Sequence, residues 1–345
     1  MVDSLLQVCN VSKSLRYMGL LNMQTSHAKV GRRLPRFPGY QRAQSVPEVE
    51  SELLSESEFI RHYVHRNQPV VIRGATRHWP ALKWDANTLR DRIDGTQNLF
   101  SSDGFLITQP FGEYQGGFDS KRRRQFRRAA GQTMSAAEFF RLLDDSSFLT
   151  AYAVPLSTPG MEAFTEGFSG FDFVDLEKRP PRLSNYRSRV FLYKCGYTDW
   201  HFHDADETLT VQLLKPKELL LLPTDRATFE RMTRVLPHRP GWEIDLNTDI
   251  EFGGVTPLRV LLEPGDAVYL PVHWWHAVES VDDEFGVTLA FTFASPLDVQ
   301  TDPRFAAVRA SLHTLFKKRS KKLLLKMLLG AGLSLMRHPV APPYL

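Results

Sequence analysis

Residues 190–222 read VFLYKCGYTDWHFHDADETLTVQLLKPKELLLL, and this stretch decides the fold. His201 and His203 stand two residues apart, and a β-strand sends alternate side chains to the same face. Residues 264–280 read PGDAVYLPVHWWHAVES, a turn followed by an apolar strand that leads to His276. Two histidines on one strand and a third on a distant strand predict a facial metal site inside a barrel, suited to non-haem iron, zinc, copper or nickel.

These two segments resemble the jumonji-C branch of the cupin superfamily, the iron(II)- and 2-oxoglutarate-dependent oxygenases. The similarity is greatest to small hydroxylases related to the asparaginyl hydroxylase that acts on hypoxia-inducible factor. Residues similar to the family's N-terminal lead-in are Phe59, Tyr63, the segment 69–74 (PVVIRG), Trp79, Pro80 and Trp84. The resemblance covers roughly residues 50–300. It implies a mainly β (α+β) fold, a double-stranded β-helix or jelly roll with N-terminal bracing helices and C-terminal helices.

The resemblance also implies a catalytic site. In this interpretation Fe(II) is bound by His201, His203 and His276, which leaves three positions open on the metal. Thr198 and Lys217 match the threonine and lysine with which the family binds 2-oxoglutarate. The implied reaction hydroxylates a C–H bond and converts 2-oxoglutarate to succinate and CO2, and the expected substrate is a protein side chain.

Several positions depart from the family pattern. His203 stands where the family normally has Asp or Glu, which removes one negative charge from the ligand set. Asp206 or Glu207 reaches the metal only if the chain bulges. Thr208 and Ala290 also replace an asparagine and a polar residue of related enzymes. Three outcomes therefore stay open: an active oxygenase with three His ligands, an active oxygenase that uses a nearby acid, and an inactive descendant. We favour an active enzyme.

A second resemblance is to the germin-like cupins. The pattern Gly196-x4-His201-x-His203-x3-Glu207 is similar to the first motif of that family, and it implies three His ligands, one Glu ligand and no 2-oxoglutarate. A third hypothesis is a non-catalytic binding module. The N-terminal lead-in and the two matches to cosubstrate-binding residues favour the jumonji-C resemblance.

The sequence predicts a division into three segments: a disordered basic leader over 1–50, the JmjC/cupin-like catalytic domain over 51–300, and a C-terminal helical tail over 301–345. Residues 4–47 contain no acid. A mitochondrial transit peptide has the same composition, but we favour a disordered leader. The two cysteines, Cys9 and Cys195, allow no disulfide framework, so we expect an intracellular protein of the cytoplasm or nucleus, with the mitochondrion as the alternative.

One basic and one apolar segment have more than one interpretation. The run Lys121–Arg128 is typical of a solvated loop, and nucleic-acid binding there is the interpretation we do not favour. The apolar stretch Leu323–Met336 contains Lys326 and is too short to span a bilayer, so no transmembrane segment is expected. For this stretch we favour packing, or a homodimer formed through C-terminal helices, over a helix at a membrane interface.

Local signals predict most of the other elements. Ser55–Glu58 and Ser135–Glu138 are capping boxes that open helices to about residue 66 and over 136–143. Further helices are expected at 86–93, 226–235 and 305–316. Apolar runs bounded by turn residues predict barrel strands at 190–193, 209–213, 218–222, 258–262, 267–270, 276–281 and 287–293.

Overall fold

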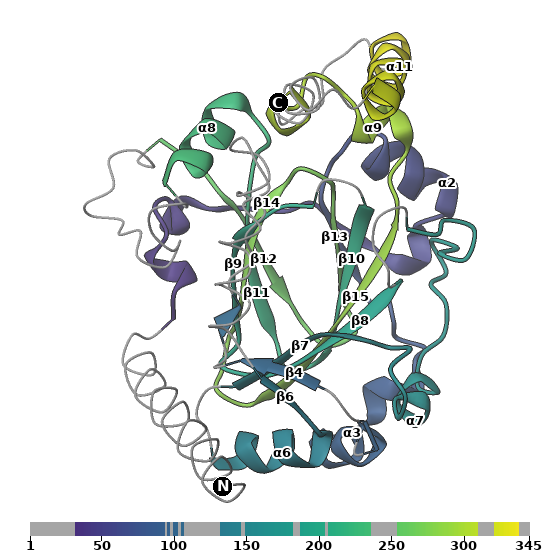
Figure 1. Cartoon of the computed structure of the whole chain (residues 1–345). Coiled ribbons are helices and arrows are strands. Elements are labelled where there is room, and N and C mark those ends of the chain that lie inside the picture. The colour runs from purple at the N-terminus through teal and green to yellow at the C-terminus, as the bar shows by residue number, and fades with distance from the viewer. Residues whose placement is uncertain are drawn as a thin grey trace, which may run out of the picture.

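The computed structural model describes residues 32–93, 95–96, 99–102, 105–106, 132–145, 149–181, 187–203, 206–235, 254–309 and 321–337. The strands of these residues form two sheets that pack against each other, with helices around the outside (Figure 1). The smaller sheet, called sheet A below, has the order β1-β12-β11-β14-β9-β5. Its strands are β1 (Gln44–Ser45), β5 (Phe105–Leu106), β9 (Tyr197–His201), β11 (Lys217–Leu222), β12 (Leu258–Leu262) and β14 (Trp275–Ser280).

The larger sheet, called sheet B below, has the order β2-β3-β13-β10-β15-β8-β7-β4-β6 within the described residues. Its strands are β2 (Glu48–Glu50), β3 (Val70–Arg73), β4 (Leu99–Ser102), β6 (Gln132–Met134), β7 (Leu149–Pro155), β8 (Ser188–Lys194), β10 (Asp206–Leu214), β13 (Ala267–Leu270) and β15 (Phe285–Ala294). The run β13-β10-β15-β8 is antiparallel and faces the antiparallel run β12-β11-β14-β9 of sheet A. Four antiparallel strands on each side make the double-stranded β-helix, so the predicted fold class is confirmed.

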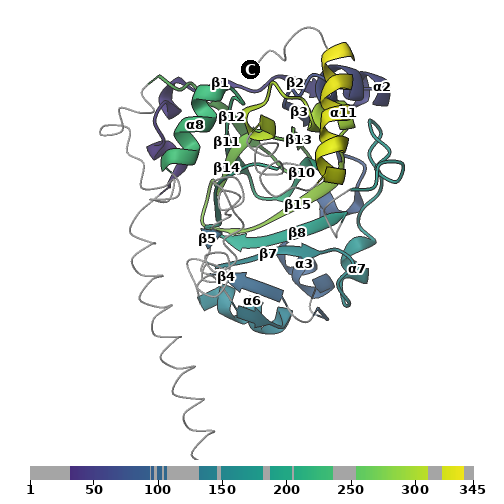
Figure 2. The same ribbon diagram turned by 45° about the horizontal axis from the view of Figure 1, so that its top comes forward.

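Helices surround the two sheets (Figure 2). They are α2 (Glu56–Glu58), α3 (Ala86–Ile93), α6 (Ala136–Asp145), α7 (Glu162–Thr165), α8 (Arg226–Val235), α9 (Leu297–Gln300) and α11 (Lys321–Arg337), with the π-helix η4 (Phe59–Val64) and the 3-10 helices η1 (Leu34–Arg36), η2 (Tyr40–Arg42), η3 (Ser51–Leu53) and η5 (Pro80–Lys83). The capping box at Ser55 forms in both directions, but the helix becomes a π-helix at Phe59. Across the described part of the chain, every helix falls short of the length and apolarity that crossing a bilayer requires.

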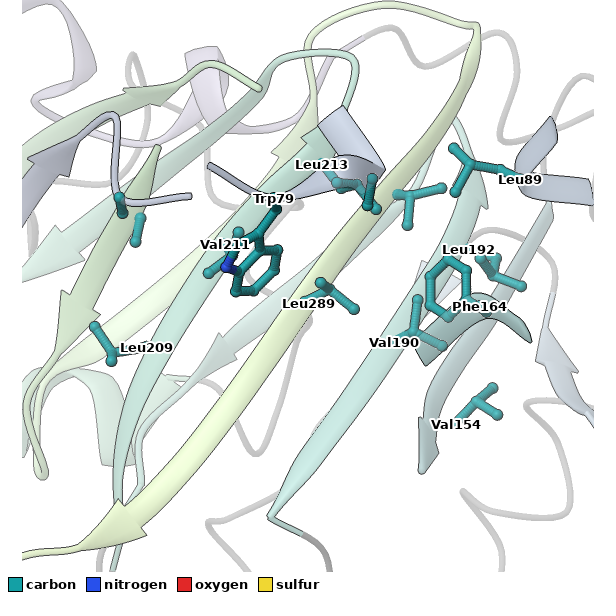
Figure 3. Packing of buried hydrophobic residues seen from close by; sticks show 14 of the residues in the cluster. Trp79, Leu89, Val154, Phe164, Val190, Leu192, Leu209, Val211, Leu213 and Leu289 are labelled. Carbon is teal, nitrogen blue, oxygen red and sulfur yellow. The ribbon is translucent and has the colours of Figure 1, made fainter. Parts of the chain in front are cut away.

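Apolar side chains alternate between the two faces of each sheet and so build two layers. Leu219, Leu221 and Val278 of sheet A meet Val268 and Leu270 of sheet B in the interior between the sheets. The alternate residues of these strands point to the outer face of sheet B, where the helical lead-in packs against them (Figure 3). The labelled members of this outer layer are Trp79, Leu89, Val154, Phe164, Val190, Leu192, Leu209, Val211, Leu213 and Leu289. The lead-in therefore braces the barrel, as the resemblance implies.

Most local predictions agree with the structure. The seven expected barrel strands coincide with β8, β10, β11, β12, β13, β14 and β15 to within a few residues. The expected tail helix coincides with α11. The basic run Lys121–Arg128 and most of the helix expected at 305–316 lie outside the described residues.

The disordered leader predicted over 1–50 is wrong for residues 32–50, which are folded onto the barrel. Leu34 is buried, and this segment forms η1, η2, β1 and β2. β1 pairs with β12 of sheet A, and β2 pairs with β3 of sheet B, so the segment joins the two sheets.

Two buried carboxylates explain why this segment is ordered. Glu218 of β11 and Glu279 of β14 are direct cross-strand partners, and both are almost completely buried. Arg32 pairs with both carboxylates, and the backbone N–H groups of Arg33 and Leu34 donate to Glu279 at 2.6 and 3.0 Å. Burying two adjacent acids is unfavourable without cations and donors, and residues 32–34 supply them.

Candidate metal centre

The barrel interior brings the three predicted histidines together. His201 ends β9, and His276 lies on β14 as its cross-strand partner. His203 follows β9 by two residues, and its carbonyl oxygen accepts a hydrogen bond from the backbone N–H of His273 at 2.6 Å. This bond ties the segment that carries His203 to the loop that leads into β14.

The three imidazoles form one compact group. One ring nitrogen from each of His201, His203 and His276 lies within 4.8 Å of the other two. The ring centroids are 4.1 Å apart for His201 and His276, 4.9 Å for His203 and His276, and 5.4 Å for His201 and His203. On a facial octahedral or tetrahedral ion with metal–imidazole bonds of about 2.1 Å, the ligand nitrogens lie about 3.0–3.4 Å apart, so a shift of about 1 Å by each nitrogen closes the group on one ion.

Protonation states in this group suit a metal. Burial, followed by the fields of His201 and Arg189, holds the pKa of His203 well below its usual range. Burial also lowers the pKa of His276, with contributions from the other two histidines. The Nδ1 of His276 lies 3.0 Å from the carbonyl oxygen of Trp274. A carbonyl only accepts, so Nδ1 carries the proton and Nε2 offers its lone pair.

Thr208 fixes the orientation of His203. The Oγ1 of Thr208 lies 2.7 Å from Nδ1 of His203, which leaves Nε2 as the nitrogen free to face an ion. Thr208 lies on β10 of sheet B, so this bond connects the metal group to both sheets. Thr208, at the position where the resemblance leads us to expect an asparagine, therefore contacts the group of three histidines.

A β-bulge places Thr198 on the interior face. His201 pairs with His276, and Thr198 pairs with Val278, so three residues of β9 oppose two of β14. Cross-strand partners point to the same face, and His276 and Val278 point to the same face because they are two residues apart. Thr198 thus shares the face of His201 despite its odd spacing, as a cosubstrate-binding residue beside the metal requires.

Lys217 lies deeper in the same interior. It pairs with Ser280, four residues beyond His276 on β14 and therefore about 13 Å further along the strand. Its Nζ lies 3.8 Å from the ring centroid of Tyr193, and it donates to Thr288 Oγ1 at 3.2 Å. Lys217 and His276 are therefore on the same interior face of sheet A, at different depths along its strands.

Burial makes Lys217 an unusual cation. Desolvation lowers its pKa from 10.5 to about 7 and is the sole cause of the shift, so no carboxylate of the described residues compensates its charge. The surrounding hydroxyls are already engaged with one another: Thr288 donates to Gln212 at 2.7 Å, and Gln212 donates to the Tyr193 hydroxyl at 2.8 Å. A buried ammonium with polar neighbours and no anion fits the distal carboxylate of a bound acid.

Glu207, the less certain fourth metal ligand, lies elsewhere. Thr208, the next residue on β10, faces the interior, so Glu207 faces the outer side of sheet B. Its carboxylate accepts hydrogen bonds from Tyr269 OH at 2.8 Å, Val272 N at 3.0 Å and Ser295 Oγ at 2.6 Å. The bulge that was needed to return Glu207 to the metal occurs instead between Gln212 and Leu214. This placement argues against Glu207 as a ligand.

Arg189 is an interior residue that the sequence reasoning missed. It pairs with Ala290 on β15 and has the same parity as Phe191, whose ring lies near Lys217. The positive charge of Arg189 lowers the pKa of His203. The charge of Asp206 acts in turn to raise the pKa of Arg189. The sequence carried only part of the signal: Arg189 alternates in phase with Phe191 on β8, whereas its pairing with Ala290 depends on the register between β8 and β15.

Comparison with known proteins supports this geometry. A family model described as a cupin-like domain matches residues 55–298. The chain belongs to the cupin-like, JmjC-type family. The match to this cupin-like family starts at the capping box of α2 and ends in α9, so it includes all three histidines, Thr198 and Lys217.

Similar proteins are distant relatives within this family. HSPB1-associated protein 1 of Bos taurus is 26% identical over 234 residues, which cover 62% of this chain and 46% of that protein. HSPB1-associated protein 1 of Homo sapiens is 25% identical over 230 residues, with the same shares covered. The arginine-specific demethylase JMJ20 of Arabidopsis thaliana is 22% identical over 279 residues, or 72% of this chain and 57% of that protein. The chain spans about half the length of these curated relatives.

Proposed function

We propose that this protein is an Fe(II)- and 2-oxoglutarate-dependent oxygenase that hydroxylates a protein side chain. The observation that carries the proposal is the shared interior of three clustered imidazoles and one desolvated, uncompensated Lys217. A metal site alone is compatible with many cupin activities. A 2-oxo acid that binds the metal through two oxygens also needs a partner for its distal carboxylate. The buried ammonium of Lys217 on β11, some way along the strands from the histidines, is suited to that part.

Each residue has a defined part in the proposed reaction. His201, His203 and His276 hold the metal through ring nitrogens, and burial favours the neutral form of His203 and His276. Iron(II) bound there supplies the activation of O2 that is coupled to 2-oxoglutarate decarboxylation. Lys217 takes up the distal carboxylate of 2-oxoglutarate, and Thr198 contributes a hydroxyl on the same face. The apolar interior residues exclude water from the cup.

The ligand set itself predicts a difference from carboxylate-containing sites. Three neutral imidazoles leave the full charge of the ion uncompensated, which weakens selectivity for iron over zinc. The position of Glu207 speaks against the germin-like alternative, because its three donors occupy the carboxylate on the other side of sheet B. An inactive binding module remains the competing hypothesis, and it has no need of an uncompensated interior lysine.

A protein substrate is supported by the relatives. Two relatives are named for association with HSPB1, and another is named as an arginine-specific demethylase. Both names describe proteins that act on or bind other proteins, and we extend that property to this chain as part of the proposal.

Activity is tested by measuring succinate. The full-length protein, loaded with Fe(II) in the presence of ascorbate, should convert 2-oxoglutarate to succinate, and candidate peptides should accelerate the turnover. His276→Ala should abolish succinate formation, whereas Glu207→Gln should retain it. Bound metal that is lost in Glu207→Ala, together with an absence of succinate, would instead favour the germin-like alternative. Absence of bound metal, together with an absence of succinate with every peptide in a broad library, would favour the binding module.

A further inference from the structure

Helix α11 exposes an apolar stripe. Its residues of this kind are between 52% and 73% exposed: Leu325, Leu328, Leu329, Leu335 and Met336. Spacings of three and four residues place them on one side of the helix. Large apolar side chains that gather on one exposed helix face mark a site of interaction rather than a packing surface.

The opposite side of α11, which packs against α9 and Thr301, is made of small residues. Gly330, Ala331 and Ser334 are buried there. A Cβ added to Gly330 would lie 2.1 Å from Oγ1 of Thr301, so the backbone approaches the segment after α9 too closely for a larger residue. The close approach at Gly330 thus fixes the helix with its leucines exposed, and packing of the stripe against the core is excluded for this helix.

Charge gives the second observation. Residues 303–345 contain nine Lys or Arg and no Asp or Glu. At the C-terminal end of α11, Arg337 lines a pocket of about 450 Å³ together with Arg61, His65, Arg66 and Asp298. Asp298, the one acid in this lining, lies 3.7 Å from Arg337 and 3.9 Å from His65. In the described part of the chain, Arg61 and Arg66 form no ion pair with an acid.

Stripe and pocket are contiguous, because Arg337 follows Met336 of the stripe. A second copy of the chain would bring two acid-free segments together and place like charges side by side. A nucleic acid would pair with the cations and leave the leucines exposed. An anionic bilayer accommodates both the leucines and the cations. The leucines enter the boundary between headgroups and acyl chains, and the cations contact lipid phosphates.

We propose that α11 lies flat on an anionic phospholipid surface, with a lipid phosphate held in the pocket between Arg61, Arg66 and Arg337. The stripe supplies the apolar part of the binding and the basic tail the electrostatic part. The proposal is independent of the catalytic function, because none of these residues lines the barrel interior.

Vesicle flotation of the full-length protein tests the proposal. The protein should float with vesicles of phosphatidylcholine and phosphatidylserine and not with phosphatidylcholine alone, and salt should weaken the binding. Leu328→Ser/Leu329→Ser should reduce affinity about tenfold or more. Arg61→Ala/Arg66→Ala should reduce it about fivefold for each charge removed. Leu261→Ser, which removes an exposed leucine of β12, is the matched control and should bind like the wild type.

Three results would overturn the inference. The first is equal binding to neutral and anionic vesicles, or to neither. The second is unchanged anionic binding of the leucine double variant, confirmed as folded by circular dichroism. The third is a dimer in sedimentation that this variant converts to a monomer, which would assign the stripe to a second copy of the chain. Should the double variant unfold, Leu325→Ser/Met336→Ser samples the same stripe at separate positions.

Discussion

Replacing Lys217 by methionine should make the protein more stable while removing the proposed cosubstrate site. The lysine is buried, and desolvation lowers its pKa from 10.5 to about 7. At about 1.4 kcal/mol for each pKa unit, this depression corresponds to about 5 kcal/mol of unfavourable folding free energy for the charged form. Methionine keeps an unbranched apolar stem and removes the charge. Relaxation of the folded protein around the charge makes 5 kcal/mol an upper limit, so we expect a gain of about 2–5 kcal/mol at pH 6.

The pH dependence gives the sign of the effect. Below pH 7 the lysine is charged in both the folded and the unfolded states, and the full cost is present. As pH rises from 7 towards 10.5 the folded protein has lost the proton while the unfolded chain retains it, and the cost declines. The advantage of Lys217→Met should therefore shrink to about 1 kcal/mol at pH 9.5.

Urea unfolding at pH 6 and pH 9.5 measures this difference directly. Lys178→Met is the matched control, because Lys178 is exposed and its partner is Asp175, so its stability should change by less than about 0.5 kcal/mol. The reasoning fails if Lys217→Met destabilises the protein at pH 6, or if its effect is the same at both pH values.

Three further predictions concern residues around the site. Arg189→Met should strengthen Fe(II) binding several-fold in an anaerobic titration, because it removes a cation whose field acts on His203; weaker binding would contradict the assignment. Glu207→Gln should lower the free energy of unfolding in urea by about 1–3 kcal/mol, because the amide NH2 group would face buried donors. The number of metal ions bound per chain should not change. Arg33→Ala should lower the free energy of unfolding by up to about 3 kcal/mol in the same measurement, because Glu279 is buried beside Arg33. An unchanged free energy of unfolding would show that Arg32 alone compensates the charge of Glu279.

Features set by short-range patterns were predictable. The barrel strands follow from apolar runs between turn residues, and the Ser55 capping box forms as its sequence indicates. The three metal-site histidines were identifiable because alternation along a strand fixes which side chains share a face. The family resemblance then identified Thr198 and Lys217, whose individual sequence contexts carry little information.

Features set by long-range pairing were not predictable. The register that turns Thr198 inward depends on how β9 pairs with β14, some eighty residues later. Arg32 and its neighbours look like part of a basic leader until Glu218 and Glu279 are seen side by side on β11 and β14. The parity that sends Glu207 outward likewise depends on the start of β10, which its own sequence leaves ambiguous.

The most direct test of the central claim is calorimetric titration under anaerobic conditions, with Fe(II) first and 2-oxoglutarate second. The wild type should bind one equivalent of each. His276→Ala should lose both binding events, and Lys217→Met should retain the metal and lose 2-oxoglutarate. Retention of full 2-oxoglutarate affinity by iron-loaded Lys217→Met would contradict the account.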